Sequence, residues 1–215
     1  MRVSKRFFDI TFSFIGLILL FPFFVLIVLL IKLKDGNPIF FKQERVGYKG
    51  KPFYIWKFRT MIVNAEKSGR QITIGKDPRI TAIGYYLRKF KLDELPQLFN
   101  VLKGEMSFVG PRPEVPKYVF LYNENQRQVL QLKPGITDIA SIRYYNENDI
   151  LAQAPNPDAI YREEIMPEKI RLNLEYAKNA NLWTDFLVVL QTIFPVIKKL
   201  NKKDRGAISY GPGQN

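Results

Sequence analysis

Two adjacent carboxylates, Asp93 and Glu94, stand in a basic stretch of the sequence that also contains Arg88. Side chains next to each other on a helix point about 100° apart, so this pair cannot share one proton. The two can divide labour, with one attacking an electrophile and the other holding a cation. Cations close by would hold a phosphate beside the pair and lower the pKa of both carboxyls. The alternative is that both acids decorate the first turn of a helix, where the helix dipole favours negative charge.

A second candidate is Arg112, which is held between Pro111 and Pro113. Rigid framing reduces the entropy that a side chain loses when it grips a ligand. A guanidinium group matches a phosphate bidentately. An ordinary surface turn is the other interpretation of this segment.

The composition limits the chemistry further. The chain has 33 Lys and Arg against 20 Asp and Glu, a formal net charge of +13, and neither cysteine nor histidine. Disulfides, Cys/His zinc sites and catalysis by a histidine or a thiolate are therefore excluded. An enzyme of this composition must use a carboxylate, Lys, Tyr, Ser or Thr. The excess of positive charge indicates an anionic partner, which is a nucleic acid, an acidic membrane surface or a phosphorylated substrate.

An uncharged apolar run of 22 residues extends from Ile10 to Ile31. As a straight helix it would be about 33 Å long, enough for a bilayer core of about 30 Å. Lys and Arg flank both ends, and these residues prefer the cytoplasmic side. Pro22 near the middle of the run cannot donate a backbone hydrogen bond and bends a helix. We therefore favour a re-entrant helix-break-helix over residues 1–34; a kinked spanning helix remains the alternative.

The rest of the sequence predicts an α+β domain dominated by helices. Strand-forming residues on either side of a turn at 47–50 predict a small β-hairpin. Helices are expected over 79–90, 95–102, 117–132 and from Pro167 to about 180, with 143–158 a polar loop. The segment 182–200, broken at Pro195, is either an interfacial amphipathic helix or a core helix. The expected domains are a membrane segment (1–34), a cytoplasmic catalytic domain with interfacial helices (35–205) and a tail (206–215).

Several motifs in order resemble the bacterial sugar transferase family, the monotopic polyprenyl-phosphate phosphoglycosyl transferases. The strongest is LRKFKLDELPQLFNVLKGEMSFVGPRPE at 87–114. The others are KRFFD before the apolar run, QERVG at 43–47, KFRTM at 57–61 and KPGIT at 133–137. Together they cover about residues 1–142 closely and 165–200 loosely.

The resemblance implies a mechanism. Asp93 would attack the β-phosphorus of a UDP-sugar and release UMP, and polyprenyl (undecaprenyl) phosphate would then take the phosphosugar from the aspartyl intermediate. Glu94, with Asp93 nearby, would hold Mg²⁺. Arg88 and Arg112 would bind phosphates, with Lys57 and Arg59 as weaker candidates. The re-entrant helix, broken at Pro22, would place the enzyme among the lipids of the bacterial inner (cytoplasmic) membrane, with its catalytic domain on the cytoplasmic face. The reaction would be the first membrane step of glycoconjugate assembly.

The sequence departs from the family pattern in two places. The family often has an acid in the C-terminal helix where this chain has Asn173, with Glu175 close by. Residues 143–165 are also divergent, so the sugar cannot be carried over from the resemblance.

Two other functions compete with this interpretation. A glycosyltransferase that binds a metal through Asp-x-Asp is disfavoured because the sequence has no such motif. A basic membrane-tethered binding protein without catalysis, for instance one for nucleic acid, would use the aromatic and basic residues of 53–61. That alternative leaves Asp93 and Glu94 unexplained, since bare carboxylates repel phosphates, and we expect no nucleic-acid partner.

Overall fold

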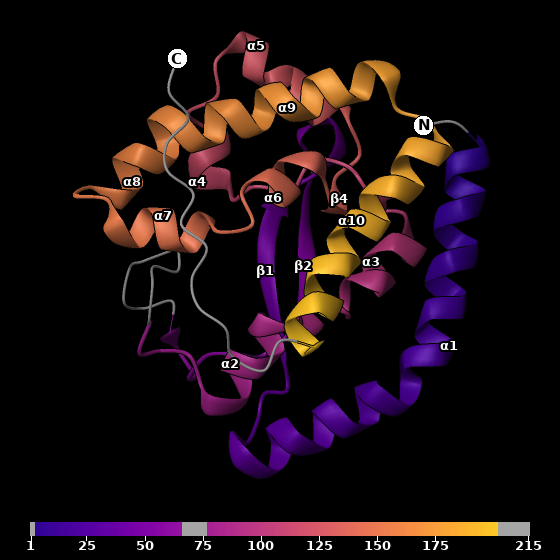
Figure 1. Cartoon of the computed structure of the whole chain (residues 1–215), viewed down its shortest axis with the longest axis vertical. Helices are drawn as coiled ribbons and strands as arrows, with labels where there is room; N and C mark the ends of the chain where they lie inside the picture. The colour runs from indigo at the N-terminus through magenta and orange to yellow at the C-terminus, as the bar shows by residue number, and fades with distance from the viewer. Residues whose placement is uncertain (1–2, 66–76, 202–215) are drawn as a thin grey trace.

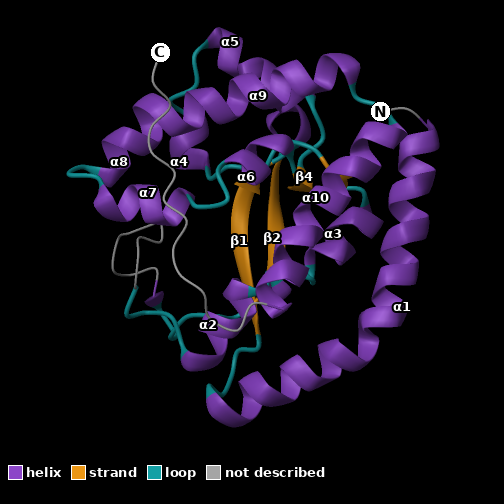
Figure 2. Ribbon diagram, viewed as in Figure 1, coloured by secondary structure: helices purple, strands orange, loops and turns teal. Residues whose placement is uncertain are grey.

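A long bent helix and a central β-hairpin organise the chain in the computed structural model, which describes residues 3–65 and 77–201 (Figures 1 and 2). The predicted tail over 206–215 lies outside the described residues. Strand β1 (Phe40–Val46) pairs antiparallel with β2 (Pro52–Phe58), so that Phe40 faces Phe58 and Val46 faces Pro52. The connection contains the 3-10 turn η1 (Tyr48–Gly50). The predicted hairpin and the α+β class are confirmed.

Helix α1 (Val3–Lys34) contains the apolar run and remains helical through Pro22. Figure 1 shows that it bends, so that it follows first one side and then the base of the domain. The proline ring removes one helix hydrogen bond and favours such a bend. The predicted interruption is thus a bend in a continuous helix. By length and composition α1 is able to cross a membrane.

Both ends of α1 are attached to the same domain. Near its start, the Arg6 guanidinium donates to the carbonyl oxygens of Val101 (2.6 Å) and Leu102 (2.7 Å). Just after its end, the Asp35 carboxylate accepts a hydrogen bond from the Thr81 hydroxyl at 2.7 Å. Between these points Phe24, Ile27 and Ile31 pack against Phe58 and Leu87, which makes one of the hydrophobic clusters.

The segment after the hairpin carries the carboxylate pair. Helix α2 (Ala82–Lys89) leads into the 3-10 turn η3 (Leu92–Glu94), which is followed by α3 (Gln97–Lys103). Lys91, with a left-handed φ of 57°, turns the chain between α2 and η3. Gly104 ends α3 with φ 87°, a conformation that glycine adopts without a steric penalty.

A short parallel pair of strands, β3 (Ser107–Val109) and β4 (Gly135–Thr137), was not predicted, because three residues are too few to show an alternating pattern. Between them the predicted helix 117–132 is instead three short pieces, α4 (Pro116–Val119), α5 (Glu124–Arg127) and η4 (Gln128–Gln131). Asn123 begins α5 with a capping box, so the chain restarts a helix at this point.

The C-terminal part is helical and covers the strands. Residues 143–158, predicted as a loop, contain the whole of α7 (Glu147–Gln153). The other elements are α6 (Ile139–Arg143), α8 (Pro157–Ile160), the π-helical turn η5 (Tyr161–Ile165), α9 (Met166–Asn179) and α10 (Leu182–Asn201). Helix α10 continues through Pro195, where we had expected a break. It contacts β3 and β4 with one face and exposes Trp183 and Phe194 on another, so it both packs on the domain and presents an apolar surface.

Candidate active site

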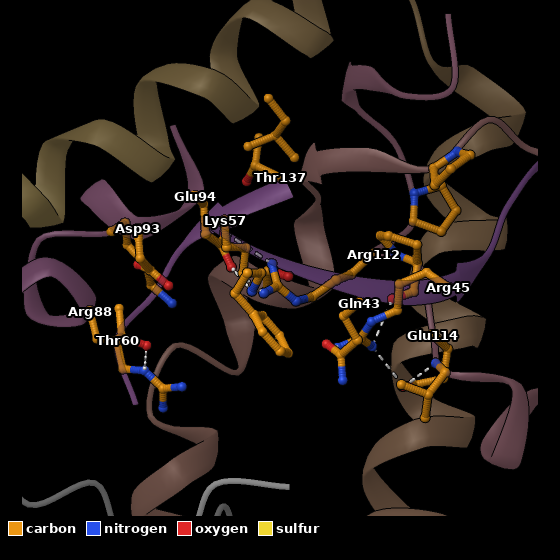
Figure 3. Close-up of a pocket in the computed structure, with 18 of the residues that line it drawn as sticks. Gln43, Arg45, Lys57, Thr60, Arg88, Asp93, Glu94, Arg112, Glu114 and Thr137 are labelled. Atoms are coloured by element: carbon orange, nitrogen blue, oxygen red, sulfur yellow. Dashed lines mark hydrogen bonds and ion pairs between the residues drawn. The ribbon is translucent and has the colours of Figure 1, made fainter. Parts of the chain in front are cut away.

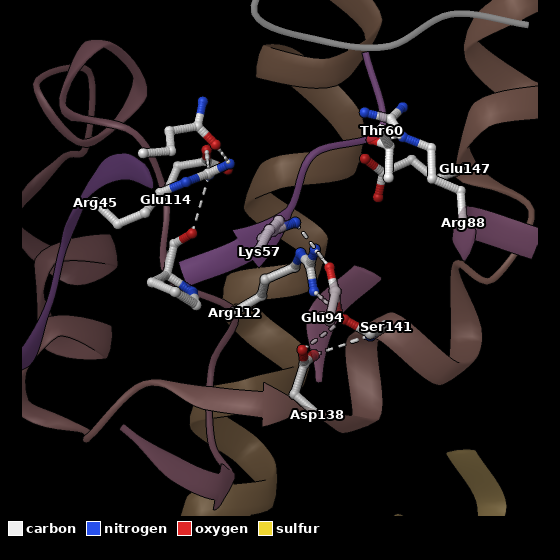
Figure 4. A network of polar contacts seen from close by, with 12 residues as sticks. Arg45, Lys57, Thr60, Arg88, Glu94, Arg112, Glu114, Asp138, Ser141 and Glu147 are labelled. Atoms are coloured by element: carbon white, nitrogen blue, oxygen red, sulfur yellow. Dashed lines mark hydrogen bonds and ion pairs between the residues drawn. The ribbon is translucent and has the colours of Figure 1, made fainter. Parts of the chain in front are cut away.

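Glu94 lies at the centre of a buried ion network (Figures 3 and 4). Lys57 of β2 donates to Glu94 Oε1 at 2.9 Å. Arg112, from the loop after β3, donates to both carboxylate oxygens, with Nη1 at 3.2 Å from Oε2. Burial would raise the pKa of Glu94, but Arg112 and Lys57 outweigh it and hold this pKa well below the ordinary value of 4.5. Glu94 is therefore an ionised carboxylate clamped by two cations.

Asp93 is buried, with 6% of its surface exposed, and accepts no hydrogen bond from the part of the chain that the structure describes. Burial and the neighbouring Glu94 raise the pKa of its carboxyl above 3.8, against the opposing effect of Lys57, Arg88 and Lys91. The sequence led us to expect a lowered pKa for both acids, which holds for Glu94 and fails for Asp93. Arg112 and Lys57 are committed to Glu94, so the lone pairs of Asp93 remain available to a ligand.

Arg88 approaches Asp93 from the end of α2 and is held there by Thr60 (Figure 3). Its Nε donates to Thr60 Oγ1 at 2.8 Å. Burial lowers the pKa of Arg88, and the nearby Asp93 opposes that effect more than any other acid does. Helix α2 can lie so close because Gly84 has no Cβ; one built there would be 2.1 Å from the Thr60 carbonyl oxygen. Sequence reasoning did not single out Thr60, although it stands in the KFRTM motif.

Arg59, the remaining predicted phosphate ligand, is 5% exposed and holds the end of α1. Its Nη2 donates to the carbonyl oxygens of Asp35 (2.6 Å) and Gly36 (2.8 Å). Its Nε and Nη1 have no partner among the described residues. Arg59 thus fastens the end of the long apolar helix α1 to β2, and its binding of phosphate stays a prediction.

A second polar network lies beside the first, farther from Asp93. Glu114 accepts hydrogen bonds from Arg45 (3.2 Å), from the Val115 backbone (2.8 Å) and from the Tyr161 hydroxyl. Gln43 accepts a hydrogen bond from the other terminal nitrogen of Arg45 at 2.7 Å. Burial and Glu114 raise the pKa of Tyr161 well above 10, so its hydroxyl stays protonated and donates. The QERVG and PRPE motifs were noticed in the sequence, but their contact was not predicted.

The acid that the family resemblance led us to expect at position 173 is Asn173, and a carboxylate nevertheless lies beside it. The Asn173 side-chain amide donates to Asp138 at 3.1 Å, and Ser141 donates to the same carboxylate from its backbone (2.9 Å) and its hydroxyl (2.6 Å). Figure 4 places Asp138 next to Glu94 and Arg112. Its negative charge raises the pKa of Arg112, although Glu94 does so more strongly. Nothing in the sequence singled out Asp138.

Asp93, Glu94 and the cations around them line one cavity of about 2060 Å³, together with the network around Glu114. A drug-sized ligand fills a pocket of about 300–1,000 Å³, so two substrates could fit at once. The described residues contain no cluster of three or more carboxylates or other metal ligands. Mg²⁺ in phosphate-transferring sites is usually held by one or two carboxylates, completed by substrate phosphates and water. Asp93 and Glu94 fit that requirement, and Asp93 is the one with unoccupied oxygens.

A buried carboxylate pair surrounded by cations thus lies in a domain that is fastened to a helix long and apolar enough to cross a membrane. The chain belongs to the bacterial sugar transferase family, whose model matches residues 1–199.

Curated relatives share this region. The chain is 38% identical over 202 residues to the UDP-glucose:undecaprenyl-phosphate glucose-1-phosphate transferase of Escherichia coli, covering 90% of this chain and 40% of the relative. It is 34% identical over 206 residues to the exopolysaccharide production protein ExoY of Sinorhizobium fredii (89% and 84%). It is 50% identical over 114 residues to a putative undecaprenyl-phosphate N-acetylgalactosaminyl 1-phosphate transferase of Bacillus subtilis (53% and 64%). The chain spans only about 40% of the length of the first of these relatives.

Proposed function

We propose that this protein is a phosphoglycosyl transferase that moves a sugar-1-phosphate from a UDP-sugar to polyprenyl phosphate at a membrane surface. The observation that carries the proposal is the contrast between the two carboxylates. Glu94 is neutralised by Lys57 and Arg112, whereas Asp93 is buried with open lone pairs and with Arg88 nearby. The names of the relatives support the reaction class and the polyprenyl acceptor.

In the first half-reaction, an Asp93 oxygen attacks the β-phosphorus of the UDP-sugar. A bond forms between that oxygen and phosphorus, the bond from phosphorus to the bridging oxygen breaks, and UMP leaves with the bridging oxygen. The sugar stays on the phosphorus, giving a phosphosugar-aspartyl intermediate, which is an acyl phosphate. Arg88 is held by Thr60 at the side of Asp93 and is placed to neutralise charge on the attacked phosphate.

In the second half-reaction, a phosphate oxygen of the polyprenyl phosphate attacks the same phosphorus. The bond from phosphorus to the Asp93 oxygen breaks, the carboxylate returns, and the product is polyprenyl diphosphate sugar. The approach of one anion to another requires cations, and Lys57 and Arg112 supply them while they keep Glu94 in position.

Asp93 and Glu94 are the residues that would hold Mg²⁺. When bound, the ion supplies positive charge that neutralises the diphosphate and the two carboxylates. A cation beside Asp93 would also lower its raised pKa and so favour the ionised, nucleophilic form.

The attachment of α1 supports a re-entrant, monotopic arrangement. A helix whose start is bound by α3 and whose end is bound by Thr81 has both ends on one domain, so the two ends belong on the same side of a bilayer. The apolar side chains that α1 turns away from the domain, among them Phe14, Leu19 and Leu26, are about half exposed or more and would face lipid. Lys and Arg at both ends favour the cytoplasmic side of the bacterial inner membrane.

The test measures the half-reactions separately. Purified protein in membrane mimetics is incubated with Mg²⁺ and a panel of UDP-sugars, with or without undecaprenyl phosphate, and UMP release is measured. We expect UMP release for the correct sugar, formation of lipid-linked product with acceptor, and an added phosphosugar mass on the Asp93 peptide without acceptor. Asp93→Asn should abolish all three.

Exposed Asp149 lies outside the cavity and provides the matched control, Asp149→Asn, which should retain activity. Full turnover by Asp93→Asn would refute the proposed nucleophile, and turnover with no adduct at any time point would contradict the two-step route.

A further inference from the structure

One end of the cavity is apolar and lies between the membrane helix and the C-terminal helix. Phe12, Gly16 and Leu20 of α1 form one wall, and Val189 and Ile193 of α10 form the other. The floor is formed by Leu98 of α3, Phe108 of β3 and Ile136 of β4. We call this end the apolar groove. Figures 1 and 2 show α10 running beside the first half of α1, with α3 between them.

The apolar groove is continuous with the reactive centre, since one cavity is lined by both sets of residues. It is also continuous with the surface that would face lipid, because Phe12 is 48% exposed on the same helix whose outer side presents Phe14 and Ile18. A molecule with an anionic head at Asp93 and a single apolar chain would satisfy both ends at once.

Polar contacts hold the α10 wall in place. The Thr192 hydroxyl lies 2.6 Å from the Thr137 hydroxyl of β4. At the other end of α10, Asp185 forms an ion pair with Lys5 at the start of α1. The two walls are therefore fixed relative to each other and to β4, which makes a preformed site with a small entropic cost of binding.

We infer that the apolar groove binds the first isoprene units of the acceptor, so that the acceptor is gripped by its chain as well as by its phosphate. This inference rests on the proposed function and adds a chain-binding subsite to it. The other polar network, around Arg45 and Glu114, lines a different part of the same cavity. In this arrangement that part would bind the nucleotide-sugar.

Gly16 makes the inference testable. An ideal Cβ at this position would lie 3.6 Å from Leu98 Cδ1, an ordinary contact, so the backbone itself tolerates a side chain there. A leucine would then occupy groove volume that the isoprene units need. On the opposite wall, Ile193 is 46% exposed, so Ile193→Trp narrows the groove without disturbing a packed core. The next residue, Phe194, does not line the cavity, and Phe194→Trp is the matched control.

The experiment measures KM and kcat for prenyl phosphates of two, three and eleven isoprene units, at saturating UDP-sugar. Each buried methylene favours binding by about four-fold. We therefore expect the wild-type acceptor KM to fall as the chain lengthens. In Gly16→Leu and Ile193→Trp, the ratio of the acceptor KM for the shortest chain to that for the longest chain should be smaller by at least about ten-fold. The KM for the UDP-sugar donor should be unchanged. Phe194→Trp should behave as wild type.

A photoaffinity measurement on the wild-type protein does not depend on any variant. A prenyl phosphate with a diazirine in its second isoprene unit should label the groove residues themselves, Phe12, Gly16 or Leu20 of α1 and Val189 or Ile193 of α10. Labelling confined to the outer side of α1, or wild-type chain-length dependence in both groove variants with donor KM intact, would overturn the inference while leaving the proposed function standing. Absence of transfer from any UDP-sugar to any prenyl phosphate by the wild type would instead overturn the proposed function.

Discussion

Replacing Glu94 with glutamine removes the anion between Lys57 and Arg112 while it keeps the side-chain volume. Removing one partner of a buried ion pair costs about 3–5 kcal/mol, because the other charge is left buried without compensation. The side chains of Glu94, Lys57 and Arg112 are 11%, 16% and 33% exposed, so two cations lose their partner and water reaches mainly the second of them. For a domain of this size the loss corresponds to a fall in Tm of about 6–20 °C.

The loss of stability in Glu94→Gln should depend on pH. Burial lowers the pKa of Lys57 below 10.5, and Glu94 is the main group that opposes this effect. In Glu94→Gln the pKa of Lys57 falls further, so the folded variant releases its proton at a lower pH than the unfolded chain does. Between those two pKa values the unfolded state binds more protons, and stability rises with pH. The Tm difference between wild type and variant should therefore narrow as the pH is raised toward 10.5.

The assay is thermal unfolding in one membrane mimetic, followed by intrinsic fluorescence between pH 6 and 10. Glu175→Gln, which changes a carboxylate that is 66% exposed, should shift Tm by no more than about 2 °C. Adding Lys57→Met to Glu94→Gln should recover part of the loss, because one unpaired cation is removed. If Glu94→Gln has the same Tm as the wild type, or if the double variant has a lower Tm than Glu94→Gln, the reasoning about a buried charge cluster is wrong.

Three further predictions follow from the same contacts. The raised pKa of Asp93 places the acid limb of the pH profile of kcat/KM above pH 3.8. A higher Mg²⁺ concentration should move this limb to lower pH. An acid limb that does not depend on the Mg²⁺ concentration would argue against a metal beside Asp93. Asp9→Ala removes the acceptor of the Ser107 hydroxyl (3.0 Å), so β3 loses an anchor to α1, and Tm should fall by about 2–12 °C in the same unfolding assay. Gly84→Ala forces α2 away from Thr60, which should cost about 1–3 kcal/mol in chemical denaturation; an unchanged midpoint would show that α2 moves freely.

The sequence by itself determined the local features of this protein. The uncharged run from Ile10 to Ile31 and the turn at 47–50 each depend on neighbouring residues, and each is found where it was expected. The absence of histidine and cysteine directed attention to Asp93 and Glu94, whose adjacency is visible without any structure. The order of the motifs was sufficient to identify the family.

Only the tertiary structure decided what each charged side chain does, because charge interactions act through space between distant segments. Arg112 was predicted to bind phosphate from its type and Lys57 from the family resemblance, yet they converge on Glu94 from a loop and a strand that are far apart in the sequence. Arg59 looks equivalent to Lys57 in the sequence but holds the end of α1. The opposite pKa shifts of Asp93 and Glu94 have the same origin, since two neighbours with similar burial differ in which cations the fold brings to them.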